Sequence, residues 1–161
     1  MKRRQWLVSL AAGACAGVLI VEKTPGDAPI EGRRVALETR EGYFVRAVKG
    51  GGDDVVANFR EPRSSEVFTL ERLDESRVRL RTREGFYLHA VKGGGDDLDA
   101  RIREPRSSEV FALEWVDQAR GQARFRTREG FYLHAVEGGG GDVDARVRTP
   151  RSSEVFTLVD R

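Results

Sequence analysis

The sequence contains very little cysteine, histidine or tryptophan. Of its 161 residues, one is cysteine, two are histidine and two are tryptophan. With Cys15 as its only cysteine, the chain has no internal disulfide and no cysteine metal site. Its stability must therefore come from packing, and a chain of this length can bury one proper core.

Sustained helical patterns and a dominant charge are also missing. No long stretch repeats apolar residues at helical spacing, and glycine or proline interrupts the sequence too often for long helices. The formal net charge is +2, and from Ile30 onward basic and acidic side chains are equal in number. Such a neutral domain has no general attraction to phosphate backbones, so we expect no nucleic-acid partner.

The first residues differ in kind from the rest of the chain. Residues 1–21 begin with basic side chains and continue as an apolar run, which predicts a signal peptide or a membrane anchor. Residues 22–32 form a polar linker. We expect export from a bacterial cell, to the periplasm or the medium. Arg3 and Arg4 resemble a twin-arginine signal, and a lipid anchor at Cys15 is an alternative.

One segment of the sequence occurs three times. The copies align without a gap and span residues 39–70, 82–113 and 127–158. A repeat of this size indicates one supersecondary unit used three times. With their flanking strands, the predicted repeats span about residues 35–73, 78–116 and 123–160.

Each copy predicts four short strands joined by glycine- or proline-containing turns. In the second copy the strands span residues 78–82, 86–90, 98–103 and 110–114. Apolar residues alternate along the third of these strands, so one face is predicted to point inward. The inward sets in the three copies are Val55, Ala57 and Phe59; Leu98, Ala100 and Ile102; and Val143, Ala145 and Val147. Asp99, Arg101 and Arg103 are predicted to point outward.

These strands predict an all-β fold, a β-trefoil of twelve strands in three pseudo-symmetric repeats. A single four-stranded unit cannot bury its apolar face, whereas three units closed around an axis can. A propeller normally has at least four blades. A solenoid of three units would leave its apolar ends exposed and needs distinct capping repeats. We therefore assign residues 33–161 to one closed domain.

The repeated pattern resembles the fascin-like β-trefoil of the actin-crosslinking superfamily. The residues that carry the resemblance in the first copy are Val35, Leu37, Thr39, Gly42, Phe44, Val45, Ala47, Val55, Ala57, Glu66, Phe68 and Leu70. Bacterial fascin-like domains often have tryptophan where this chain has Ser65, Ser108 and Ser153. The motif consists mainly of turn glycines and core positions, so it identifies a fold better than a ligand.

The resemblance implies two kinds of function. Eukaryotic fascins bundle actin, whereas bacterial relatives are often accessory modules of secreted enzymes that degrade polysaccharides. An exported bacterial domain would meet no actin. The ricin-type Gln-x-Trp signature for sugar binding does not occur in this sequence.

The two histidines occupy equivalent positions in two of the copies. His89 and His134 lie in the second predicted strand, where the first copy has Arg46. Alternation places both histidines on the solvent side of separate lobes, with no acidic partner beside them. Without such a partner, no Ser-His-Asp or Cys-His catalytic arrangement can be built. We therefore predict a protein that is not an enzyme, and we keep both histidines as candidate ligand contacts.

The glycine-rich loops carry carboxylates that suit calcium. Adjacent carboxylates on a flexible loop are good ligands for this hard cation, and the candidates are Asp96, Asp97, Asp99, Asp142 and Asp144. The spacing does not fit the nine-residue calcium-binding repeat, so we favour a role in turn formation. We predict no metal and no cofactor.

An Arg-Ser-Ser-Glu segment recurs in all three copies. Its charged residues are Arg63 and Glu66, Arg106 and Glu109, and Arg151 and Glu154. In one interpretation the serine hydroxyls and the glutamate bind backbone N–H groups of the loop. In the other, these residues form a ring of charges at one end of the barrel that binds a ligand at several points.

The sequence therefore predicts a module that binds and does not catalyse. We expect its ligand to be a glycan or a surface polymer. The alternative is a protein-interaction or structural module related to the actin crosslinkers. We expect a monomer that contacts membranes only through its N-terminal segment.

Overall fold

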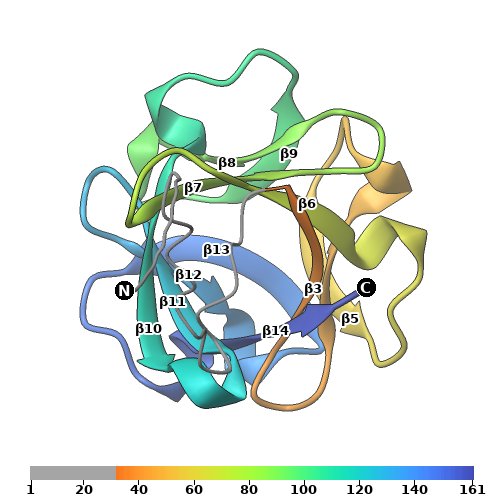
Figure 1. The fold of residues 1–161 in the computed structure, drawn as a ribbon, viewed down its shortest axis with the longest axis vertical. Coiled ribbons are helices and arrows are strands. Elements are labelled where there is room, and N and C mark those ends of the chain that lie inside the picture. Colours follow the sequence, from red (N-terminus) through yellow and green to blue (C-terminus); the bar gives the residue numbers. More distant parts are fainter. Residues whose placement is uncertain (1–31) are drawn as a thin grey trace, which may run out of the picture.

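The computed structural model describes residues 32–161, and the predicted signal and most of the predicted linker lie outside this range. None of the helices in the described range is long and apolar enough to cross a membrane. The range contains twelve strands (Figure 1): β3 Arg33–Glu38, β4 Phe44–Ala47, β5 Val55–Phe59, β6 Val67–Arg72, β7 Arg77–Arg81, β8 Tyr87–Ala90, β9 Leu98–Ile102, β10 Phe111–Asp117, β11 Gln122–Arg126, β12 Tyr132–Ala135, β13 Gly141–Val147 and β14 Phe156–Asp160. All-β structure with four strands per copy is thus confirmed.

Six of these strands close into a barrel. All neighbours are antiparallel: β3 pairs with β6, β6 with β7, β7 with β10, β10 with β11, β11 with β14, and β14 with β3. Figure 1 shows β14 meeting β3 near the C-terminus. Because the ring closes, the barrel has no unpaired edge strand.

The remaining six strands form three hairpins, one from each copy. These are β4–β5, β8–β9 and β12–β13, and each has a shift of register close to the end away from its connecting loop. Hairpin β8–β9 lies at the top of the view in Figure 1. A register shift of this kind marks a β-bulge, which adds one residue to a strand and changes the faces of the side chains beyond it.

The bulges overturn part of the predicted alternation. Phe59 was predicted to point inward but is 38% exposed. Ile102 and Val147, also predicted inward, are half-buried. Asp99 lies on the face opposite the core residues Leu98 and Ala100, as predicted, but it is only 8% exposed, so its carboxylate needs partners.

The core repeats the same apolar positions from each copy. In the second copy these are Val78, Leu80, Leu88, Ala90, Leu98, Ala100, Phe111 and Leu113. Phe68, Phe111 and Phe156 occupy equivalent positions, and all three are fully buried. Burial of a phenylalanine of this kind contributes roughly 1.5–3 kcal/mol. Packing thus supplies the stability that disulfides do not.

Short 3-10 turns connect the strands: η1 Val48–Gly50, η2 Ser64–Glu66, η3 Val91–Gly93, η4 Ser107–Glu109, η5 Gln118–Arg120, η6 Val136–Gly138 and η7 Ser152–Glu154. The glycine-rich loops after η1, η3 and η6 pack on the next copy: Gly51 contacts Phe86, Gly94 contacts Phe131, and Gly139 contacts Tyr43. Each copy therefore depends on its neighbour for the shape of its loop.

The serine hydroxyls of the Arg-Ser-Ser-Glu segments also join neighbouring copies. Ser64 Oγ accepts a hydrogen bond from Arg83 Nη1 at 2.9 Å, and Ser107 Oγ accepts one from Arg128 Nη1 at 2.6 Å. Ser152 Oγ accepts one from Arg40 Nη1 at 2.9 Å. The prediction that these hydroxyls bind backbone N–H groups of their own loop is therefore wrong, because neighbouring arginines reach them.

Candidate functional site

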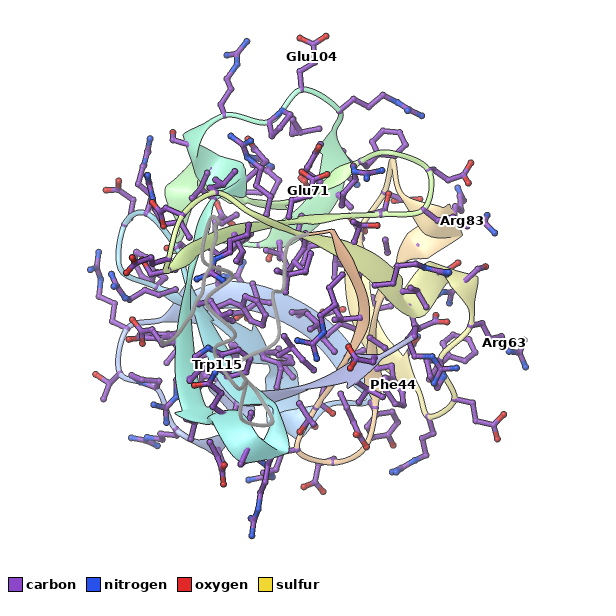
Figure 2. All side chains as sticks on the ribbon, viewed as in Figure 1. Phe44, Arg63, Glu71, Arg83, Glu104 and Trp115 are labelled. Carbon is purple, nitrogen blue, oxygen red and sulfur yellow. The ribbon has the colours of Figure 1, made fainter. Side chains whose placement is uncertain are left out.

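A cavity of about 580 Å³ lies in the second copy, between strands β8 and β9 and turn η4. Its polar lining comes mainly from His89, Arg101, Arg103, Glu104, Arg106, Ser107, Ser108 and Glu109. Three predicted site residues, His89, Arg106 and Glu109, are thus brought together. Figure 2 shows Glu104 pointing away from the body of the domain at the top of the view.

His89 lies between two carboxylates. Its Nδ1 is 3.0 Å from Asp99 Oδ1, and its Nε2 is 3.6 Å from Glu109 Oε1. The side chain is 19% exposed, so the prediction of a solvated histidine without an acidic partner is wrong. The antiparallel register places Asp99 directly opposite His89. Pairing positions across the predicted β8–β9 hairpin could have revealed this contact.

The arrangement of His89 favours a structural role in the cavity wall. Both ring nitrogens face carboxylates, so neither is left to take a proton from a ligand in the cavity. The imidazole instead joins Asp99 of strand β9 to Glu109 of turn η4. It thereby fixes the distance between the two walls of the cavity.

Glu109 holds the turn that carries Arg106. The carboxylate is 3% exposed and accepts a hydrogen bond from the backbone N–H of Arg106 at 2.5 Å. Glu66 and Glu154 do the same for Arg63 and Arg151. The predicted anchoring of the loop by the glutamate is therefore confirmed. The prediction that the glutamates belong to a ligand-binding ring of charges is wrong. Their buried carboxylates must be satisfied by groups within the protein.

The arginines of the repeated segment remain on the surface. Arg63, Arg106 and Arg151 are exposed, and Figure 2 shows Arg63 projecting from the edge of the domain. Throughout residues 32–161, none of the three takes part in an ion pair through its guanidinium. Arg106 is therefore a cavity residue whose guanidinium donors remain available to a ligand.

The other two cavity arginines are fixed by contacts elsewhere. Arg103 lies over the ring of Phe86, 4.0 Å from its centroid, and donates from Nη1 to the carbonyl of Glu84 at 2.9 Å. Arg101 reaches back to the first copy, where its Nη2 is 2.7 Å from Asp54 Oδ1. Both guanidinium groups are thereby positioned before any ligand arrives, which lowers the entropic cost of binding.

The third copy repeats this arrangement. His134 Nδ1 is 2.9 Å from Asp144 Oδ1, and its Nε2 is 3.6 Å from Glu154 Oε1. Arg148 lies 4.0 Å from the centroid of the Phe131 ring. The predicted residues His134, Arg151 and Glu154 therefore form, in the third copy, an arrangement equivalent to the cavity wall of the second copy.

The first copy differs at the histidine position. Arg46 replaces the histidine; its Nε is 3.4 Å from Glu66 Oε2, and its guanidinium lies 4.6 Å from the centroid of the Phe59 ring. Val56 stands where the other copies have Asp99 and Asp144. This lobe provides an internal control for the other two.

Four of the five candidate calcium ligands have side-chain partners within the protein. Asp96 and Asp97 both bind Arg146, at 3.4 Å and 2.7 Å, while Asp99 and Asp144 face the histidines. The backbone N–H of Asp97 and the ammonium of Lys92 lower the pKa of Asp96. In the part of the chain that the structure covers, no three acidic, histidine or cysteine side chains gather as a metal site. Asp142, the remaining candidate, is exposed.

Two solved structures have a similar fold. A structure described as SeviL bound to asialo-GM1 saccharide has a TM-score of 0.65 and 17% identity, and the match covers 80% of this chain and 97% of that one. A designed protein with threefold symmetry, ThreeFoil, has a TM-score of 0.69 and 14% identity, and the match covers 80% of this chain and 99% of that one. Both are β-trefoil proteins. The fold of this chain is therefore a β-trefoil.

The chain belongs to the family described as "Domain of unknown function (DUF7910)", whose model matches residues 30–158. No curated protein matches the sequence. The comparisons do not show the fascin-like superfamily, so that resemblance stays a prediction, and they give no support for actin crosslinking.

Proposed function

We propose that this protein is a non-catalytic β-trefoil module that binds glycan through the cavity of its second copy and the equivalent wall of its third copy. We also propose that the three lobes are related by pseudo-threefold symmetry, and that the protein acts as an exported monomer. The observation that carries the proposal is the cavity of about 580 Å³, with a pre-positioned polar lining.

The lining suits the hydroxyl groups of a sugar. Arg106 offers guanidinium donors, Glu104 offers acceptors, and Ser107 and Ser108 can do both. Ile102 adds an apolar surface beside these groups. The likeness to SeviL, whose structure contains a saccharide, supports a glycan as the ligand. A weak contact at each of two lobes would multiply on a polymer that reaches both.

Binding to a panel of insoluble polysaccharides and immobilised glycans tests the proposal. We expect the full chain to bind at least one member, and Arg106→Ala to weaken that binding about tenfold through loss of charged hydrogen bonds. Arg63→Ala is the matched control, since it removes the equivalent arginine from the lobe that has Arg46 in place of histidine. Failure to bind any glycan of a broad panel, or an equal loss in both variants, would contradict the proposal.

A further inference from the structure

A second hollow, separate from the cavity, lies between the second and third copies. It is a groove of about 380 Å³ whose polar lining consists of Ser76, Arg77, Ser107, Arg126, Thr127 and Arg128. Three arginines and three hydroxyl groups thus meet there, and no carboxylate lines the groove. Such a lining offers hydrogen-bond donors to an anion.

Carboxylates hold the three guanidinium groups through their Nε atoms. Nε of Arg126 is 2.5 Å from Glu114, Nε of Arg128 is 3.0 Å from Glu129, and Nε of Arg77 is 2.6 Å from Asp74. A guanidinium has five N–H donors, so each arginine keeps further donors on its terminal nitrogens. The arginines are therefore oriented by the protein and can still bind an acceptor from outside.

The same groove recurs between the first and second copies. There it has a volume of about 220 Å³, and its polar lining consists of Arg34, Ser64, Thr69, Arg81, Thr82 and Arg83. Arg81 Nε is 2.6 Å from Glu71, as Arg126 is from Glu114. Two boundaries between copies therefore carry three arginines each.

The third boundary, between the third and first copies, lacks this charge. Glu38 occupies the position that Arg81 and Arg126 have at the other two boundaries. It pairs with Phe44, as Arg81 pairs with Tyr87 and Arg126 with Tyr132. Gln122 stands where the other boundaries have Arg34 and Arg77, and only Arg40 is retained. The barrel closes at this boundary without the other two arginines. The fold itself therefore does not require them.

The groove adjoins the glycan cavity, because Ser107 lines both. We infer that the arginine-lined groove between the second and third copies binds the acidic groups, sulfate or carboxylate, of an acidic polysaccharide whose sugar rings occupy the adjoining cavity of the second copy. This inference rests on the proposed function and specifies its ligand class. A nucleic acid fits less well, because Glu104 in the cavity lining opposes a continuous phosphate backbone, and the domain has no excess of basic side chains.

Calorimetric titration of the full chain with matched polymers tests the inference. The probes are dextran, dextran sulfate, polygalacturonate, its carboxyl-reduced form and a single-stranded DNA oligonucleotide. Sulfate and carboxylate are thereby compared as sources of the negative charge. The variants are Arg77→Gln and Arg126→Gln, and Glu38→Gln is the matched control at the third boundary. Substitution of Arg77 should disturb folding less than substitution of Arg126, since the Arg77 side chain is 60% exposed.

We expect an acidic polymer to bind more tightly than its neutral counterpart. We expect each arginine substitution to reduce this preference about tenfold, because charged hydrogen bonds are lost, and Glu38→Gln to cause no reduction. Equal affinity for acidic and neutral polymers, or an unchanged preference in both arginine variants, would overturn the inference and leave the proposed function standing. Binding to neither type would contradict both, and tighter binding of the oligonucleotide than of every polysaccharide would overturn the acidic-glycan assignment.

Discussion

Substitution of Gly94 by alanine should destabilise the domain strongly, because this glycine lies where the second copy packs on the third. Its φ is +125°, and a Cβ atom there would lie 2.5 Å from Thr127 Oγ1 and 2.7 Å from Phe131 Cδ2. Thr127 is buried and holds the first turn of the third copy. Neither neighbour can move without disturbing that turn.

The expected cost has two parts. A non-glycine residue in a sparsely populated backbone region costs about 1–3 kcal/mol, and forcing extra volume into a packed contact costs about 1–3 kcal/mol more. The free energy of unfolding should therefore fall by about 2–6 kcal/mol, a large share of the roughly 5–15 kcal/mol typical of a domain. Urea unfolding followed by tryptophan fluorescence measures this change, since Trp115 packs against the core.

Gly141→Ala is the matched control for this substitution. A Cβ atom at Gly141 would have no neighbour within 4 Å, so its effect should stay within about 0.5 kcal/mol, as for most surface changes. Equal unfolding midpoints for the two variants would refute the claim that the glycine-rich loops join the copies.

Three further substitutions test the site and the surface. Glu109→Ala removes the buried carboxylate that accepts from the part-buried N–H of Arg106, so urea unfolding should show a loss of about 1–3 kcal/mol, and glycan binding should weaken with it. Backbone N–H groups, first that of Ser76, and the Arg77 side chain lower the pKa of Asp74 to about 2. The carboxylate therefore stabilises the fold above about pH 4, and this contribution is lost as the pH falls toward 2; Asp74→Asn should flatten the acid-unfolding profile in that window. Arg103→Ala removes a cation–π contact and should cost about 0.5–1 kcal/mol in urea unfolding.

The fold was accessible from the sequence because its signals are local and repeated. Alternation in strands such as Val78–Leu80 and Phe111–Leu113 marks the core face, and all four residues are buried. Strand ends were predicted to within a few residues. Three copies of one pattern leave few architectures that can close.

The site was less accessible, because it depends on register and on contacts between copies. The contact of His89 with Asp99 depends on the register of the β8–β9 hairpin, which places the two residues directly opposite each other. Alternation alone predicts a solvated Asp99, whereas this residue is only 8% exposed. The bond from Arg128 to Ser107 joins residues 21 positions apart in neighbouring copies. Such contacts become visible only when the copies are placed side by side.

Mapping of a bound glycan by NMR tests the central claim most directly. The polysaccharide fragment that binds most tightly is titrated into the labelled full chain, and backbone amide shifts are followed. The account predicts the largest shifts in turn η4, at Ser107, Ser108 and Glu109, and in strand β8 at His89, with equivalent shifts in the third copy. Shifts confined to the first copy, or the absence of shifts at saturating glycan, would contradict it.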